Sequence, residues 1–265
     1  MAFIEISEVT KSYLSKDGLV ETKVILPLSM EIAEGEIIMF LGPSGCGKTT
    51  LMRMVGGLEK QDHGTIQLKG ELLSSPDRRR GMVFQSYSSF PWLSVRNNIK
   101  FGTRYRRDIS AKKKEEVTDY YLNMVGLSEY ADFYTNRISG GMRQRVAIAR
   151  TLASAPEVLL MDEPFGALDA QTREYLQFQL MEINKSEKKT TIFVTHDVEE
   201  AILLANRIII FSARPARVVK EISVDEVIPA EERRVDFASL PEFFELRKKI
   251  VEIIREEYLH ALEAK

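Results

Sequence analysis

The sequence predicts an α/β fold with a mainly parallel sheet, on three observations. Four short segments are apolar throughout, as strands are when helices cover both faces of a parallel sheet. They are Ile37–Leu41, Val158–Met161, Thr191–Val194 and Ile208–Phe211. Helical patterns separate these segments along the chain. A glycine-rich turn directly follows the first segment and leads into a helical pattern, which is the strand–turn–helix arrangement of such folds.

An antiparallel β subdomain is expected at the N-terminal end. Alternating apolar residues predict a strand with one buried face. The alternation runs through Val24, Leu26, Leu28, Met30 and Ile32. Phe3–Val9 is a second strand candidate, so the parallel core follows a short antiparallel sheet.

Helical patterns fill the middle and the end of the chain. A helix is predicted after Ser110 as N-cap, with Gly126 as its stop. Its apolar stripe consists of Val117, Tyr120, Tyr121, Met124 and Val125. A second helix is expected from about Gly141 to Ala153 and a third from Phe243 to Leu262. The apolar stripe of the third consists of Leu246, Ile250, Ile253, Ile254 and Tyr258. We therefore expect one domain over 1–225, with an inserted α-helical subdomain at about 90–155, and a C-terminal helical extension over 226–265.

Composition and charge exclude several classes of protein. The chain has 265 residues and a formal net charge of −2, which argues against a generally basic nucleic-acid-binding surface. Its single cysteine rules out an intramolecular disulfide. The apolar runs are far shorter than the roughly 20 residues that span a bilayer. Arg78–Arg80 reads as a solvated loop ahead of a core strand.

Residues 42–49 carry a phosphate-binding motif, Gly-Pro-Ser-Gly-Cys-Gly-Lys-Thr, which fits G-x-x-x-x-G-K-[ST]. Glycines let successive N–H groups turn toward phosphate oxygens, and the following helix adds its positive dipole end. Lys48 is expected to reach the β- and γ-phosphates, and the Thr49 hydroxyl to bind Mg²⁺. The expected nucleotide-binding set is Gly42, Pro43, Ser44, Gly45, Cys46, Gly47, Lys48, Thr49 and Thr50, with Cys46 contributing its backbone alone.

Two carboxylates, Asp162 and Glu163, follow the apolar segment Val158–Met161. Ligands of open α/β sheets bind at the carboxyl ends of the strands. Asp162 is therefore expected to hold Mg²⁺, directly or through water, and Glu163 to act as general base on the attacking water. Taken alone, the pair also fits an ordinary acidic surface turn.

Further motifs occur in a fixed order along the chain. Ile138-Ser-Gly-Gly-Met-Arg-Gln-Arg145 precedes the acidic pair, Ala167-Leu-Asp169 follows it, Gln85 comes earlier, and Thr195-His196-Asp197 comes later. In this order and spacing, residues 3–220 resemble the ATP-binding subunits of ABC transporters. One departure is Ile138, where that family usually has leucine; both are apolar anchors.

The resemblance implies a role for each matching position. Tyr13 matches the aromatic residue that stacks on adenine, although a strand tyrosine packed near the core is an alternative. Gln85 matches a glutamine that ligates Mg²⁺ and senses the γ-phosphate. His196 matches a histidine that contacts the γ-phosphate and orients Glu163, so the catalytic set is Glu163, His196 and Lys48. Asp162 and Thr49 complete the metal ligands.

The resemblance also implies a dimer. Ser139, Gly140, Gly141 and Gln144 would face the ATP of the opposite subunit, and Asp169 would lie at the seam. The second subunit is a copy of this chain or a paralogue. ATP closes the head-to-tail pair, and hydrolysis removes the γ-phosphate contacts that favour the closed state.

The partners follow from the same resemblance. The segment Gln85–Val95 would contact transmembrane permease subunits through Phe90, Pro91 and Trp92, although core packing of Trp92 is an alternative. Pro91-Trp92 and Ser212–Pro215 with Val218 are similar to the importer branch for nitrate, sulfonates, taurine and bicarbonate, which also includes thiamine-precursor importers. An extracytoplasmic solute-binding protein would select the solute. The expected location is the cytoplasmic face of the membrane, and no nucleic acid is expected.

Other functions compete with solute import. An ABC ATPase of a lipid transporter would share every catalytic residue. One serving DNA repair or translation would usually carry a long coiled-coil insertion or two tandem heads, and this chain has one phosphate loop and one signature. A small-molecule kinase or GTP switch is disfavoured by the Ile138–Arg145 segment and by the lack of a guanine-reading Asn-Lys-x-Asp.

Overall fold

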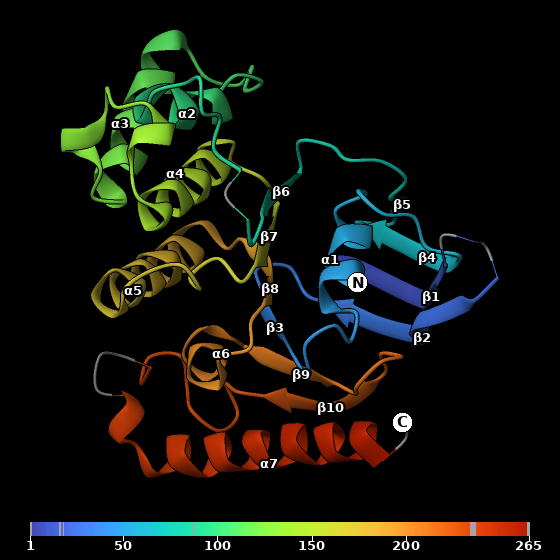
Figure 1. Ribbon diagram of the computed structural model, residues 1–265. Coiled ribbons are helices and arrows are strands. Elements are labelled where there is room, and N and C mark those ends of the chain that lie inside the picture. Colours follow the sequence, from blue (N-terminus) through green and yellow to red (C-terminus); the bar gives the residue numbers. More distant parts are fainter. Residues whose placement is uncertain (1, 16, 18, 87, 234–236, 264–265) are drawn as a thin grey trace. The chain divides into compact units, whose positions relative to one another are not determined.

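The computed structural model describes residues 2–15, 17, 19–86, 88–233 and 237–263 (Figure 1). The chain divides into two compact units. One consists of Met1–Pro76 with Thr190–Lys265, and the other of Asp77–Lys189. The division of the chain into domains at 90–155 and 226–265 stays a prediction.

The first unit holds an antiparallel sheet in the order β2-β1-β4-β5, with β1 Ile4–Leu14, β2 Glu21–Ile32, β4 His63–Leu68 and β5 Glu71–Leu72. Ile4 pairs with Ile32 on one side and with Leu68 on the other. Val24, Leu28, Met30 and Ile32 are buried, as the alternation predicted, whereas Leu26 is only half-buried and Ile25 is buried beside it. This confirms an antiparallel start of the chain.

The same unit contains three neighbouring parallel strands, β3 Ile37–Leu41, β8 Thr190–Val194 and β9 Arg207–Phe211, with β3 in the middle. β3 and β8 are buried at every position. Strand β10, Val218–Ser223, pairs antiparallel with β9. β10 was not predicted, because its sequence VVKEIS does not alternate between apolar and polar residues and only Ile222 among its side chains is buried.

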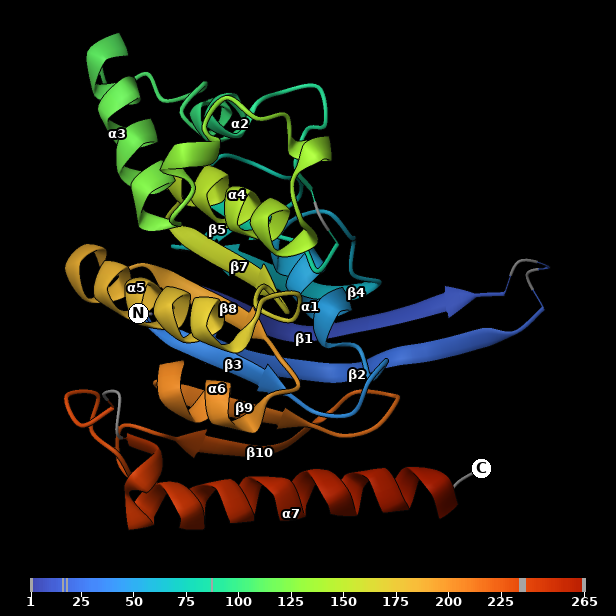
Figure 2. The same cartoon turned by 60° about the vertical axis from the view of Figure 1, so that its left-hand side comes forward.

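Three helices complete this unit: α1 Lys48–Val55, α6 Val198–Leu204 and α7 Pro241–Glu263. In Figures 1 and 2, α7 runs alongside β10. It buries Phe243, Leu246 and Ile250, as its stripe predicted. Tyr258, expected on the same stripe, is 56% exposed. Position 258 lies beside Glu257, whose side chain takes the buried position there.

The second unit pairs two parallel strands, β6 Arg80–Val83 and β7 Val158–Asp162. Its helices are α2 Val95–Gly102, α3 Ala111–Met124, α4 Gly140–Ala153 and α5 Ala170–Glu187, with short 3-10 turns at Ser128–Tyr130 and Thr135–Arg137. Each of the four longer helices begins at a side-chain oxygen cap, on Ser94, Ser110, Ser139 or Asp169.

Helix α3 confirms its predicted ends but corrects its stripe. Tyr120 was expected inside and is 57% exposed, whereas Thr118 is fully buried. The buried positions Thr118, Tyr121, Leu122 and Val125 keep helical spacing. Threonine can stand there because its Oγ1 donates to the Lys114 carbonyl at 2.7 Å.

Arg80 corrects the expectation of a solvated loop at 78–80. It begins β6 and its side chain is 2% exposed. Its Nη2 lies 3.1 Å from Oδ2 of Asp77, and Arg79 Nη2 lies 3.1 Å from the same oxygen. Burial raises the pKa of the Asp77 carboxyl, but the bonds from Arg80 and Arg79 outweigh it and hold that pKa below its ordinary value.

We expect Asp77→Asn to lower the free energy of unfolding by about 1 kcal/mol at neutral pH, a value kept small because Asp77 is partly exposed. A carboxyl with a lowered folded pKa stabilises the fold above its unfolded pKa of about 4, and this contribution disappears as the pH falls through the folded pKa. Urea unfolding of both proteins at neutral pH and near pH 3 measures the change. An equal difference at the two pH values would contradict the assignment.

Candidate functional site

The phosphate loop joins β3 to α1, and two of its glycines have no substitute. Gly42 has φ +146°, and a Cβ there would lie 2.7 Å from the Phe211 carbonyl oxygen. Gly47 has φ +127°, and a Cβ there would lie 3.1 Å from the Val24 oxygen. Both positions need the left-handed region and a close backbone approach, so the sequence motif reflects local geometry.

Lys48 begins α1 and curls back over the loop. Its side chain is buried, and its Nζ donates hydrogen bonds to the carbonyl oxygens of Gly42 at 2.7 Å and Pro43 at 2.9 Å. The helix begins after Gly47, which provides no side-chain cap. A cation and a helix N-terminus at one loop favour an anion there.

The burial of the other loop residues agrees with an anion site formed by the backbone. Cys46 is buried, 1% exposed, which agrees with a packing role and not with an accessible thiol. Ser44 and Gly45 are exposed at the turn, while Thr49 and Thr50 stand half-buried in the first turn of α1.

The acidic pair stands at the carboxyl end of β7, in the other unit. Asp162 is the last residue of that strand and is 4% exposed. Glu163 has φ +45°, a conformation that strains any residue except glycine. Its Oε2 accepts a hydrogen bond from Nε2 of Gln85 at 2.8 Å. Two positions 78 residues apart, both selected from the sequence, are thus brought into contact.

The signature segment, Ile138–Arg145, leads into α4 in the same unit. The Ser139 hydroxyl accepts from the Met142 N–H at 3.2 Å, and Gly140 and Gly141 form the first turn. A Cβ on Gly141 would lie 3.3 Å from the Ala167 oxygen, so this turn approaches the segment that leads to Asp169.

Asp169 caps the next helix, α5. Its Oδ1 accepts from the Thr172 N–H at 3.0 Å, and this bond lowers the pKa of the Asp169 carboxyl. Asp169 is therefore a fixed, exposed carboxylate at a helix start.

Gln144 lies differently from the rest of its motif. It is 1% exposed, and its Nε2 donates to the Phe84 carbonyl oxygen at 3.3 Å, toward the end of β6. Its Oε1 is buried with no hydrogen-bond partner among the described residues. In the described unit, Gln144 therefore ties α4 to the segment before Gln85, and its nucleotide contact stays a prediction.

His196 and Tyr13 belong to the unit that holds the phosphate loop. His196 is exposed directly after β8. The next residue, Asp197, caps α6 by accepting from Glu199 N–H at 2.9 Å. Tyr13, on β1, is 40% exposed with Lys11 Nζ 5.2 Å from its ring centre, so it is not packed in the core.

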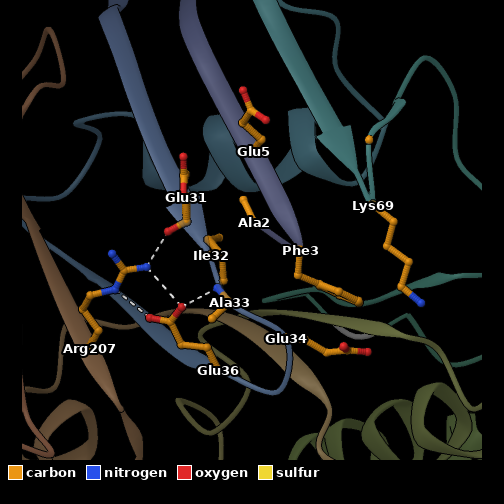
Figure 3. Close-up of a pocket in the computed structure, with 11 residues that line it drawn as sticks. Ala2, Phe3, Glu5, Glu31, Ile32, Ala33, Glu34, Glu36, Lys69 and Arg207 are labelled. Carbon is orange, nitrogen blue, oxygen red and sulfur yellow. Dashed lines mark hydrogen bonds and ion pairs between the residues drawn. The ribbon is translucent and has the colours of Figure 1, made fainter.

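A large acidic cavity lies beside the start of β3, whereas the phosphate loop follows the end of that strand. Figure 3 shows the residues that line the cavity. The cavity encloses about 950 Å³ and is lined by Glu5, Glu31, Glu34 and Glu36 together with Lys69 and Arg207. Arg207 Nε lies 2.6 Å from Glu36 Oε1, and Glu36 Oε2 accepts from Ala33 N–H at 2.7 Å. Its excess of carboxylates opposes a phosphate ligand, so volume alone does not mark the nucleotide site.

The segment after Gln85 forms a clamped loop; its Tyr87 lies outside the described residues. Asn98, fully buried on α2, accepts from Phe90 N–H at 2.8 Å and donates to the carbonyl oxygens of Phe90, Leu93 and Ser94. Trp92 is 69% exposed, which excludes the core-packing alternative. Asn98 was missed from the sequence, because a polar residue in a helical stretch normally indicates a solvated face.

Known proteins identify the chain. The profile of the family described as "ABC transporter" matches residues 25–166, more than half of the chain. The chain belongs to the ABC transporter family. It is 41% identical over 256 residues to the nitrate import ATP-binding protein NrtD of Synechocystis sp., covering 95% of each chain. It is 44% identical over 230 residues to the taurine import ATP-binding protein TauB of Jannaschia sp., covering 86% of this chain and 85% of that one.

Solved structures agree with this assignment. A dimeric ATP-binding cassette bound to ADP and phosphate superposes with a TM-score of 0.75 at 31% identity, covering 83% of this chain and 98% of the other. The ABC ATPase fold predicted from the sequence is confirmed, and the protein is an ATP-binding transport ATPase. In the described part of the chain, no helix is long and apolar enough to cross a membrane.

Proposed function

We propose that this ABC ATPase drives import of a small solute of the nitrate, sulfonate, taurine or bicarbonate kind. The observation that carries the proposal is the full set of nucleotide motifs in a chain similar over 95% of its length to a nitrate import subunit. ATP hydrolysis is the reaction of the family, and we assign its steps to residues of the phosphate loop, the acidic pair, Gln85 and His196.

The phosphate loop supplies binding. Lys48 Nζ, which now bonds to the Gly42 and Pro43 carbonyl oxygens, would exchange these for oxygens of the β- and γ-phosphates. A charge-assisted bond to phosphate is about twice as strong as a neutral one. The loop N–H groups and the uncapped start of α1 complete the anion site.

Mg²⁺ fits the donor set of the proposed ligands. The Thr49 hydroxyl, the Gln85 side-chain carbonyl and the Asp162 carboxylate are the hard oxygen ligands that this ion prefers. Gln85 bonds to Glu163 through its nitrogen, so its Oε1 is not used in that bond. When bound, Mg²⁺ neutralises charge on the phosphates.

Glu163 would accept the proton of the attacking water. The water oxygen forms a bond to the γ-phosphorus, the bond from that phosphorus to the bridging oxygen of ADP breaks, and ADP and phosphate leave. The Gln85 amide holds the carboxylate at 2.8 Å, which fixes its direction. His196 would contact the γ-phosphate and help to orient Glu163.

A second cassette would complete each site. Family members form dimers, and a solved relative is dimeric with ADP and phosphate bound. The first turn of α4, at Ser139–Gly141, and the carboxylate of Asp169 would face the nucleotide of a second copy or a paralogue. The N-terminus of a helix is suited to a γ-phosphate.

The clamped loop would meet the membrane subunits. An exposed tryptophan on a rigid, hydrogen-bonded loop is a favourable anchor for a protein interface. The ATPase would therefore work at the cytoplasmic face, held by permease subunits, while an extracytoplasmic solute-binding protein selects the solute.

We expect the Trp92→Ala variant no longer to bind the permease, because truncating an interface tryptophan costs about 2 kcal/mol or more of binding free energy. Affinity purification of the tagged protein from native membranes in mild detergent measures this. A multi-span protein should accompany the wild type and be lost with Trp92→Ala. Tyr105→Ala, which removes another exposed aromatic residue of the same unit, is the control and should retain it.

If only soluble proteins or nucleic acid are recovered with the wild type, the transport proposal is wrong, and the protein is an ABC ATPase that works without membrane subunits. If the protein belongs to a lipid transporter, a membrane protein should also co-purify with it, but the substrate of that membrane protein would be a lipid and not a small polar solute.

A further inference from the structure

One arginine connects the helix of the signature segment to the loop that carries Trp92. Arg150 lies in the last turn of α4, whose first turn contains Gly140 and Gly141. Its Nη2 donates a hydrogen bond to Ser88 Oγ at 2.8 Å. Its guanidinium carbon lies 4.6 Å from the centre of the Phe90 ring. No sequence motif marks this residue.

Phe90 is the centre of this contact. Its ring centre lies 5.4 Å from that of Trp92 and 4.8 Å from that of Phe101. The guanidinium of Arg150 therefore adds a cation to an aromatic cluster that includes the exposed anchor. The main chain at Phe90 is held independently by Asn98 and by Thr135, whose Oγ1 donates to the Phe90 oxygen at 2.8 Å.

The end of α2 abuts the same point of α4. A Cβ on Gly102 would lie 2.1 Å from the Arg150 carbonyl oxygen, a distance that no side chain can occupy. Helix α2 begins at Val95, directly after the Trp92 loop. Backbone contact on one side and the guanidinium on the other thus join the loop to α4.

Stability alone is a poor reason for an arginine here. Its Nη1 is buried with no hydrogen-bond partner among the described residues, and burial lowers the pKa of Arg150. Burying a cation with incomplete partners costs free energy that an apolar side chain of similar length avoids. What an apolar side chain cannot supply is the directed bond to Ser88 and the cation over Phe90.

We propose that Arg150 is a positioning residue that makes the Trp92 loop move together with α4. A displacement of the Ser139–Gly141 end is thereby passed to the surface carrying Trp92. The inference rests on the proposed function for what the two ends bind, namely nucleotide and membrane subunit. The connection between α4 and the Trp92 loop rests only on the contacts of Arg150 with Ser88 and Phe90.

Trp92 makes the test direct, because it is the only tryptophan of the chain and its fluorescence reports on this loop. The full-length protein is titrated with ATP in a Glu163→Gln background, and ATP affinity is measured separately by equilibrium binding. Saturating ATP should shift the Trp92 emission. Arg150→Met should lose that shift while ATP affinity and the melting temperature stay at the parent values.

Three variants separate positioning from packing. Arg150→Lys keeps the cation but not the planar fork, so it should restore part of the shift. Ser88→Ala removes one hydrogen bond, should also reduce the shift, and serves if Arg150→Met does not fold. Arg96→Met removes an arginine paired to Asp119 in the same unit and should leave the shift unchanged.

The outcomes separate this inference from the proposed function. A protein without ATP affinity contradicts the proposed function. Two results overturn the inference alone. One is a parent protein that binds ATP without any shift of the Trp92 emission. The other is a full emission shift in both the Arg150→Met and the Ser88→Ala variants.

Discussion

Glu163→Gln should bind ATP and fail to hydrolyse it, with kcat falling by about a thousandfold, in the middle of the range for a general base. The amide keeps the size of the carboxylate and can still meet the Gln85 amide, but it accepts no proton from water. If Glu163 meets the γ-phosphate as proposed, removing its negative charge also favours ATP binding. Phosphate release and equilibrium ATP binding measure the two effects separately.

The control is Glu174→Gln, an exposed carboxylate on α5 in the same unit, which should hydrolyse ATP like the wild type. If Glu163→Gln also retains the wild-type rate, then another group accepts the proton. The positive φ of residue 163 belongs to the main chain and is retained by the substitution, so the two proteins differ in chemistry and not in backbone strain.

Lys48→Ala should weaken ATP binding by about a hundredfold, which corresponds to about 3 kcal/mol. The substitution removes a buried cation that bonds to the loop carbonyls, at the place where two phosphates are expected to gather. Isothermal titration with ATP measures the change.

The matched control is Lys69→Ala. Lys69 belongs to the same unit but lines the acidic cavity beside the start of β3, so its removal should leave ATP affinity unchanged (Figure 3). A comparable loss in both variants would mean that general charge, not the phosphate loop, governs binding. Melting curves without nucleotide should show whether Lys48→Ala remains folded.

The buried strands could be predicted because their sequence is unambiguous. β3, β7 and β8 are buried at every position, and a short unbroken apolar run between helical patterns is typical of a strand covered on both faces. β10 and the position of Thr118 on α3 could not be predicted, since this edge strand shows no alternation of apolar and polar residues and a threonine is normally expected to be exposed. In each case a tertiary neighbour or a local hydrogen bond decides the burial, and neither leaves a periodic signal.

The residues of the candidate site also fall into those that the sequence predicts and those that only the fold reveals. The phosphate loop and the acidic pair are contiguous in sequence, so spacing alone points to them. Gln85 was selected only through resemblance, and the structure adds its 2.8 Å contact with Glu163. Asn98 and Arg150 carry no motif, because their importance arises from atoms that folding brings to them.

The Asn98 clamp bonds to main-chain atoms at positions 90, 93 and 94. Its bonds therefore do not depend on which side chains stand at positions 91 and 92. The side chains at those two positions can therefore be substituted while the hydrogen bonds that hold the loop remain. If this loop meets the membrane subunits as proposed, exchanging residues 91–92 with those of another transport ATPase should change the choice of membrane partner and leave the main-chain bonds of Asn98 in place.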